Sequence, residues 1–222
     1  MQFDNLSICF DLDGTLVDTA PDLVRVLNLV IAEDGLEPTD YTSARNQVGL
    51  GALKLIREAF KRANRAITEN REQELLDLFL KLYEEDIAQL SQPFAGVIST
   101  LQILKRQGAH LSVCTNKPGY LARPLISALN MDNYFDRVVG SRDGYASKPS
   151  PELVFAAAGH RRNDNIIMVG DSTPDILAAK AARVPGILVT YGYANMPWAR
   201  MRAEKVLRQF SELPAALLSI RA

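Results

Sequence analysis

The sequence predicts an α/β fold with a parallel five-stranded sheet, helices on both of its faces and a helical segment inserted after the first strand. Three observations lead to this expectation. Five short runs rich in β-branched residues are apolar at consecutive positions, which is typical of parallel strands buried on both faces. Helical patterns alternate with these runs. Residues 20–93 form a long stretch with helical periodicity and no strand signal.

The five expected strands all end in small or polar residues. Because helical patterns separate them, right-handed crossovers would bring them side by side in one parallel sheet. The runs are LSICFD (6–11), HLSVCTN (110–116), RVVGS (137–141), IIMVGD (166–171) and GILVTYG (186–192).

Helices are expected between the strands, and local signals mark their ends. Gly108 closes the first pattern, in the position that glycine favours after a helix. Ser150 is a suitable N-cap for the third pattern, with Pro151 at its first position. The three patterns are VISTLQILKRQG (97–108), YLARPLISALN (120–130) and PELVFAAAGH (151–160).

Residues 20–92 are expected to form a helical domain of their own, inserted into a core domain made of residues 1–19 and 93–222. The insertion leaves the sheet where the first strand ends, which is where a lid would lie. Apolar side chains recur along it at helical spacing. The residues that carry the pattern are Leu23, Val26, Leu27, Val30, Ile31, Leu75, Phe79, Leu82 and Tyr83.

Composition excludes several classes of protein. The 222 residues are 47% hydrophobic, which suits a globular protein with a substantial core. With 25 basic and 26 acidic residues, the charge balance predicts no general attraction to nucleic acid or to an anionic membrane. No apolar run reaches the ~18 residues of a membrane span. Cys9 and Cys114 both lie in apolar strands, which favours reduced thiols and a cytoplasmic location. The oligomeric state, monomer or homodimer, is left open.

Two carboxylates directly follow the first strand, in the stretch FDLDGTLVDT (10–19). Asp11 and Asp13 are separated by one residue, and each disfavours ionisation of the other unless a cation or a proton lies between them. Other strands are also followed by polar residues, and ligands of open α/β sheets bind beyond the carboxyl ends of the strands. Oxygen ligands in this number suit Mg²⁺ completed by a substrate phosphate. The further residues are Thr115, Asn116, Gly170, Asp171, Ser172 and Asp175, with Lys148 in the loop before the third helix.

Each of these signals also has a purely structural interpretation. A D-x-D pair before glycine is common in turns, where aspartate binds backbone N–H groups. Lys148 would fit a solvated loop, and Asp171 and Asp175 would fit the cap of a helix that begins at Pro174. Their joint placement at one expected edge of the sheet favours a binding site instead.

Four sequence motifs together resemble those of the haloacid dehalogenase superfamily of phosphatases. FDLDGTLVDT is similar to the first motif, VCTNK to the second, SKPSPE to the third and VGDSTPD to the fourth. The resemblance implies a Rossmann-like core with a helical cap domain of the C1 type, inserted after the first motif. Arg183 departs from the pattern, because the family usually has glycine after the fourth-motif helix, where arginine fits a left-handed cap less comfortably.

The resemblance implies a mechanism in which Asp11 attacks phosphorus and forms an aspartyl-phosphate. Asp13 would protonate the leaving group and later remove a proton from the attacking water. The cofactor would be Mg²⁺, held by Asp11, the backbone carbonyl of Asp13 and Asp171. The substrate would be a small phosphate ester.

The same resemblance assigns supporting roles. Thr115 and the backbone at Asn116 would donate hydrogen bonds to the phosphoryl group, and Lys148 would supply a positive charge to it and to Asp11. Asp175 would orient the metal site or Lys148 from outside the ligand shell, with Ser172 beside it.

Within the superfamily, three segments are most similar to phosphoglycolate phosphatases: VGLGALKLIREA (48–59), TNKP (115–118) and TYGYAN (190–195). In the first segment, Gly49 and Gly51 lead into a helical pattern that starts at Ala52, and a helix start of this kind can bind an anion. We expect this turn to close over the site and to meet the far end of a small, doubly anionic substrate such as 2-phosphoglycolate. An ordinary turn between helices is the alternative. Nearby cations would add charge: Arg45, Lys54 and Arg57.

Other functions fit the motifs to different degrees. A dehalogenase would not need Asp13 or a metal. A phosphosugar mutase would keep every motif, as would a pyrophosphatase or a sugar-phosphate phosphatase of the same superfamily. A non-catalytic regulatory module is disfavoured because no catalytic motif residue is lost.

Overall fold

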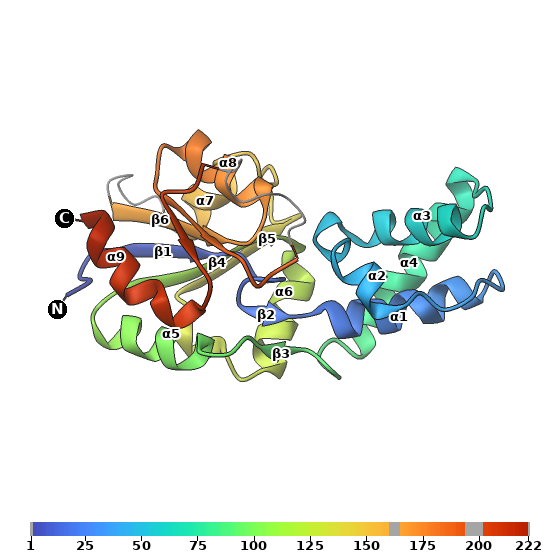
Figure 1. Ribbon diagram of the computed structural model, residues 1–222, viewed down its shortest axis with the longest axis horizontal. Helices are drawn as coiled ribbons and strands as arrows, with labels where there is room; N and C mark the ends of the chain where they lie inside the picture. Colours follow the sequence, from blue (N-terminus) through green and yellow to red (C-terminus); the bar gives the residue numbers. More distant parts are fainter. Residues whose placement is uncertain (1, 160–164, 194–201, 222) are drawn as a thin grey trace. The chain divides into compact units, whose positions relative to one another are not determined.

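The chain divides into two compact units, one made of Met1–Asp18 and Pro93–Ala222 and the other of Thr19–Gln92. The computed structural model describes residues 2–159, 165–193 and 202–221 (Figure 1). Within these ranges, no helix is both long and apolar enough to cross a membrane.

The first unit contains a sheet of six parallel strands in the order β5-β4-β1-β6-β7-β8. The five expected strands are all present. The expected number was wrong by one, because β8 has only three residues, with Lys205 at its start, and carries no apolar run that would mark a strand. The strands are β1 (Ser7–Phe10), β4 (His110–Pro118), β5 (Arg137–Ser141), β6 (Ile166–Gly170), β7 (Gly186–Val189) and β8 (Lys205–Leu207).

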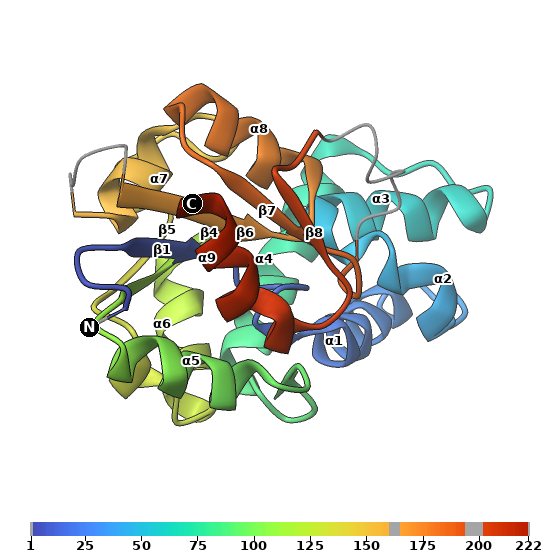
Figure 2. The ribbon, with the colours of Figure 1, turned by 60° about the vertical axis from the view of Figure 1, so that its left-hand side comes forward.

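Helices cover both faces of this sheet, as the apolar runs predict. In both ribbon views α7 and α8 lie on one face, while α5, α6 and α9 lie on the other (Figures 1 and 2). Alternate residues of each strand therefore meet different helices. The helices are α5 (Val97–Arg106), α6 (Gly119–Ala128), α7 (Glu152–Ala157), α8 (Thr173–Ala182) and α9 (Leu213–Arg221).

The core on the α7 and α8 face is made of small and medium side chains. Cys9, Cys114 and Met168 point to this face from three neighbouring strands and are fully buried against alanines and aliphatic residues of the two helices. Both cysteines are free thiols, as the sequence predicts. On the opposite face Phe10 packs against Phe210, with ring centroids 5.7 Å apart.

The helix ends follow the local sequence signals closely. Gly108 follows α5 with a φ of 90°, as expected for a closing glycine. Helix α7 begins at Glu152, one residue later than expected, and Ser150 Oγ accepts a hydrogen bond from the Glu152 N–H (3.4 Å). Arg183 ends α8 in the left-handed region, with φ 57° and ψ 43°. The chain therefore keeps the turn that usually takes glycine, at an expected strain of about 1 kcal/mol.

The second unit is helical throughout its core. Its amphipathic helices bury Leu27, Leu55, Phe60 and Phe79 among other apolar side chains. The helices are α1 (Ala20–Ala32), α2 (Tyr41–Arg45), a short 3-10 helix (Val48–Leu50), α3 (Ala52–Arg62) and α4 (Glu69–Glu85). The outgoing and returning segments of the chain, β2 (Val17–Asp18) and β3 (Gln92–Pro93), pair as a two-stranded sheet that the sequence did not predict.

One buried carboxylate fixes the start of the second unit. Asp22, in the first turn of α1, is fully buried. It accepts hydrogen bonds from the backbone N–H groups of Leu90 (2.9 Å) and Ser91 (2.7 Å) and from Arg25 Nε (3.1 Å). The carboxylate thus links the two ends of the insertion. Its hydrogen bonds also offset the free-energy cost of burying a charge.

Candidate active site

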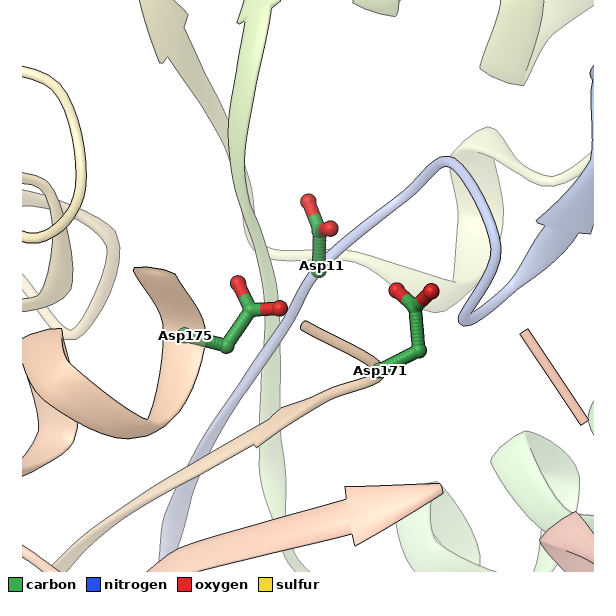
Figure 3. Close-up of side chains that lie close together, drawn as sticks. All are labelled: Asp11, Asp171 and Asp175. Carbon is green, nitrogen blue, oxygen red and sulfur yellow. The ribbon is translucent and has the colours of Figure 1, made fainter. Parts of the chain in front are cut away.

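Three carboxylates converge at the carboxyl edge of the sheet. Asp11 follows β1, Asp171 follows β6, and Asp175 lies in the first turn of α8. One oxygen from each lies within 4.8 Å of the others, and all three residues are buried. Figure 3 shows the side chains directed toward a common space. Because β1 and β6 are neighbours at the centre of the sheet, this space lies where ligands bind in open α/β folds.

Asp171 is held by two donors from distant parts of the sequence. Its Oδ1 accepts a hydrogen bond from the Thr15 hydroxyl (3.0 Å), and its Oδ2 accepts one from the Tyr193 backbone N–H (2.7 Å). The Tyr193 hydroxyl in turn donates to Asp18 Oδ1 (2.7 Å). These contacts fix the direction of Asp171, so this residue does not cap helix α8, the alternative that the sequence left open.

Lys148 lies between two of the carboxylates. Its Nζ is 2.9 Å from Asp11 Oδ1 and 2.6 Å from Asp175 Oδ1, and it also donates to the Cys114 carbonyl (2.7 Å). The Asn116 side chain holds the lysine backbone, accepting from the Lys148 N–H (2.8 Å) and donating to the Lys148 carbonyl (2.9 Å). Lys148 is therefore a buried, fixed positive charge rather than a solvated loop residue.

Asp175 serves the helix and the site at the same time. Its Oδ2 accepts hydrogen bonds from the backbone N–H (3.0 Å) and the hydroxyl of Ser172, the N-cap residue of α8. Its Oδ1 remains for Lys148. Asp175 therefore caps the helix and also contacts Lys148, because one carboxylate has two oxygens.

The electrostatics of the cluster indicate a shortage of positive charge. Burial, together with the neighbouring carboxylates of Asp175 and Asp11, raises the pKa of Asp171 to about 8. Burial also raises the pKa of Asp11 to about 6, against the lowering effect of Lys148. Burial alone would lower the pKa of Lys148, but Asp11 and Asp175 more than offset it, so this pKa is raised. A cation beside the carboxylates would favour their charged forms.

Asp13 lies apart from the three-carboxylate cluster and has a cation of its own. Lys117 Nζ is 3.0 Å from Asp13 Oδ1 and 3.2 Å from Oδ2. The backbone N–H of Lys117 donates to the hydroxyl of Thr115 (3.1 Å), a buried residue in the second half of β4. The sequence interpretation assigned no role to Lys117, although the residue stands in the VCTNK motif.

Glycines let the backbone approach the cluster closely. A Cβ on Gly192 would lie 2.3 Å from Asp171 Oδ2 and 2.4 Å from the Gly14 carbonyl oxygen. A Cβ on Gly170 would lie 2.3 Å from the Asp175 carboxyl carbon. Since real Cβ atoms do not approach so closely, these two positions require glycine for space.

The glycine-flanked loop of the second unit has the predicted local form. Gly51, with a φ of 92°, precedes helix α3, which begins at Ala52, and Gly49 lies in the short 3-10 helix before it. Among the nearby cations, Arg57 is engaged with Glu72, its Nε and Nη2 lying 2.9 and 2.7 Å from the two carboxylate oxygens. That this loop binds substrate stays a prediction.

Comparison with known proteins places these motifs in a family. The profile of the family described as "Haloacid dehalogenase-like hydrolase" matches residues 8–189. The chain belongs to this family. The match spans β1 to β7 and so includes every residue of the carboxylate cluster.

Curated relatives of this hydrolase cover nearly its full length. A phosphoglycolate phosphatase of Caulobacter vibrioides is 39% identical over 216 residues, which are 96% of this chain and 91% of that protein. A phosphoglycolate phosphatase of Agrobacterium fabrum is 39% identical over 94% of this chain and 90% of its own. A solved structure from Haemophilus somnus, described as a predicted phosphoglycolate phosphatase, superposes with a TM-score of 0.88 at 30% identity over 100% of both chains.

Most of the candidate site residues that were named from the sequence of this hydrolase, the first being Asp11 and the last Asp175, lie together in the structure. The structure adds Thr15, Lys117, Gly192 and Tyr193, which stand in segments that the sequence analysis singled out but which received no role there. The TYGYAN segment ends at residues 194 and 195, which lie outside the described residues.

Proposed function

We propose that this hydrolase is a Mg²⁺-dependent phosphatase that uses Asp11 as its nucleophile, with 2-phosphoglycolate as its substrate. The convergence of Asp11, Asp171 and Asp175 with Lys148 at the edge of the sheet is the observation that supports the chemistry. The curated names of its relatives support the substrate.

The donor set fits Mg²⁺. Carboxylate oxygens are hard ligands, and Mg²⁺ is usually bound by one or two carboxylates together with waters and a substrate phosphate. Four carboxyl groups and two ammonium groups lie at the site. With all four carboxyl groups ionised two negative charges remain, and one remains when Asp13 carries the proton that it donates, so a divalent cation would offset the excess in either state. The groups are Asp11, Asp13, Asp171 and Asp175 against Lys117 and Lys148. Asp11, the Asp13 carbonyl and Asp171 would hold the ion, which would neutralise charge between nucleophile and phosphate.

The chain's own residues would carry the reaction in two steps. In the first, a carboxylate oxygen of Asp11 attacks phosphorus, the bond from phosphorus to the substrate oxygen breaks, and Asp13 gives its proton to the leaving alkoxide. In the second, Asp13 takes a proton from a water that attacks the aspartyl-phosphate, which releases phosphate and restores Asp11. Lys148 and the Thr115 hydroxyl would stabilise the phosphoryl oxygens throughout.

A small panel of phosphate esters tests the proposal. With Mg²⁺ present, kcat/KM for 2-phosphoglycolate should exceed that for hexose phosphates and for phosphosugars that a mutase would isomerise, and EDTA should abolish turnover until Mg²⁺ is restored. A strong preference for a hexose phosphate would contradict the substrate and leave the chemistry intact. Turnover that persists in EDTA would contradict the metal.

Gly192 provides a test of the metal site that does not depend on the substrate. Gly192→Ala would place a methyl group against Asp171 Oδ2, so we expect Mg²⁺ affinity to fall about 10- to 100-fold, as for other changes that displace a ligand. Isothermal calorimetry or a Mg²⁺-dependent thermal shift would measure this.

Gly186→Ala is the matched control, because Gly186 begins β7, whereas Gly192 lies beyond the other end of this strand. A Cβ on Gly186 would meet side chains of α8, at 3.1 Å from Ala179 Cβ. It should lower thermal stability and leave Mg²⁺ affinity unchanged. Equal Mg²⁺ affinity in the Gly192 variant and the wild type would show that Asp171 is not a ligand.

A further inference from the structure

A lysine that the sequence interpretation left without a role is buried beside Asp13. The Lys117 side chain is only 5% exposed, and its ammonium group spans both Asp13 oxygens at 3.0 and 3.2 Å. A lysine buried to this degree is held by its partners rather than by solvent, since burial of an ammonium group is otherwise costly. The contact therefore fixes the Asp13 carboxylate in one orientation.

An irregularity in the backbone of β4 directs the Lys117 side chain. The pairing of β4 with β5 shifts register between Thr115 and Pro118, and such irregularities often redirect a side chain next to an active site. Gly140 on β5 makes room for the shifted segment, because a Cβ there would lie 2.5 Å from the Lys117 carbonyl oxygen. The Ser141 hydroxyl holds the same segment by donating to the Asn116 carbonyl (2.8 Å).

We infer that Lys117 is a positioning residue that holds the Asp13 carboxylate where it can exchange a proton with the leaving group and then with water. The inference rests on the proposed function, in which Asp13 is the acid and base. A general acid must lie within hydrogen-bond reach of the atom that it protonates, and a displacement of about 1 Å can cost ~10²-fold in rate. Loss of Lys117 should therefore resemble partial loss of Asp13.

The test compares substrates with poor and good leaving groups. In Lys117→Met, kcat for an alkyl phosphate such as 2-phosphoglycolate should fall about 10- to 100-fold, with KM little changed. The burst rate for an activated aryl phosphate, which reports formation of the aspartyl-phosphate alone, should fall no more than ~3-fold. Lys117→Arg, which keeps a positive donor, should recover part of the alkyl rate. In an Asp13→Asn background, Lys117→Met should cost little more, because the residue that it positions is already gone.

Controls separate this role from simple stabilisation. Lys105→Met removes the same charge from an exposed ion pair with Asp136 (3.4 Å) and should leave both rates unchanged. If Lys117→Met fails to fold, Lys117→Gln provides the same substrate comparison. Any of three results would overturn the inference: equal losses of rate on the two substrates, a rise in KM alone, or full additivity with Asp13→Asn. A wild-type enzyme inactive on 2-phosphoglycolate but active on the aryl ester would instead contradict the proposed substrate, and another alkyl phosphate would then be used.

Discussion

Asp11→Asn should reduce kcat for every phosphate ester by about 10⁴-fold or more, since asparagine has the shape of aspartate but is a very weak nucleophile. The fold should survive. Because burial raises the pKa of Asp11 to about 6, its ionised form costs stability in the metal-free protein at pH values above about 6. The neutral amide removes that cost, so the melting temperature of the metal-free variant at pH 8 should equal or exceed that of the wild type.

The control for this variant is Asp132→Asn, which makes the same change at an exposed residue of the first unit. It should leave kcat unchanged. Near-normal turnover by Asp11→Asn in the presence of Mg²⁺ would exclude Asp11 as the nucleophile. A large fall in melting temperature would mean that the loss of activity reports unfolding instead.

Asp13→Asn should separate the two carboxylates of the first motif. Asparagine cannot protonate an alkoxide, so kcat for 2-phosphoglycolate should fall about 10²- to 10⁴-fold. An activated aryl phosphate needs little protonation of its leaving group and should lose far less in the step that forms the aspartyl-phosphate. Rapid-mixing measurement of the phenolate burst on wild type and variant would report that step alone.

The burst distinguishes two roles for Asp13. With an aryl phosphate, we expect Asp13→Asn to keep a burst and to slow the steady state that follows, because activation of water also needs the carboxylate. Loss of the burst to the same extent as the steady state would indicate that Asp13 acts mainly through metal binding or local structure.

Most of the sheet could be predicted because its four inner strands, β4, β1, β6 and β7, are buried on both faces, and this burial requires continuous apolar runs. The edge strand β5 is only partly buried but still carries two adjacent valines, Val138 and Val139. The sixth strand lies at an edge, where Val206 is 38% exposed, so its sequence carries little signal. The site followed from the same reasoning, since neighbouring parallel strands end at one edge and bring Asp11 and Asp171 together from distant parts of the sequence.

The contacts missed by the sequence interpretation depend on backbone details that periodicity does not encode. The direction of Lys117 depends on a register shift within β4, and the contact of Tyr193 with Asp171 depends on the path of the loop after β7. Asp175 shows a different limit. Its capping pattern was recognised, but only the three-dimensional structure shows that the second oxygen is left for Lys148.

The proposed mechanism depends on a covalent bond between Asp11 and the phosphoryl group, and chemical trapping tests that bond directly. Wild-type protein turning over 2-phosphoglycolate with Mg²⁺ would be quenched in acid and reduced with borohydride, which converts an acyl phosphate of aspartate to homoserine. Peptide mass spectrometry should then find homoserine at position 11 and unmodified aspartate at positions 13, 171 and 175. Active enzyme that yields no homoserine at position 11, or yields it at another aspartate, would contradict the account.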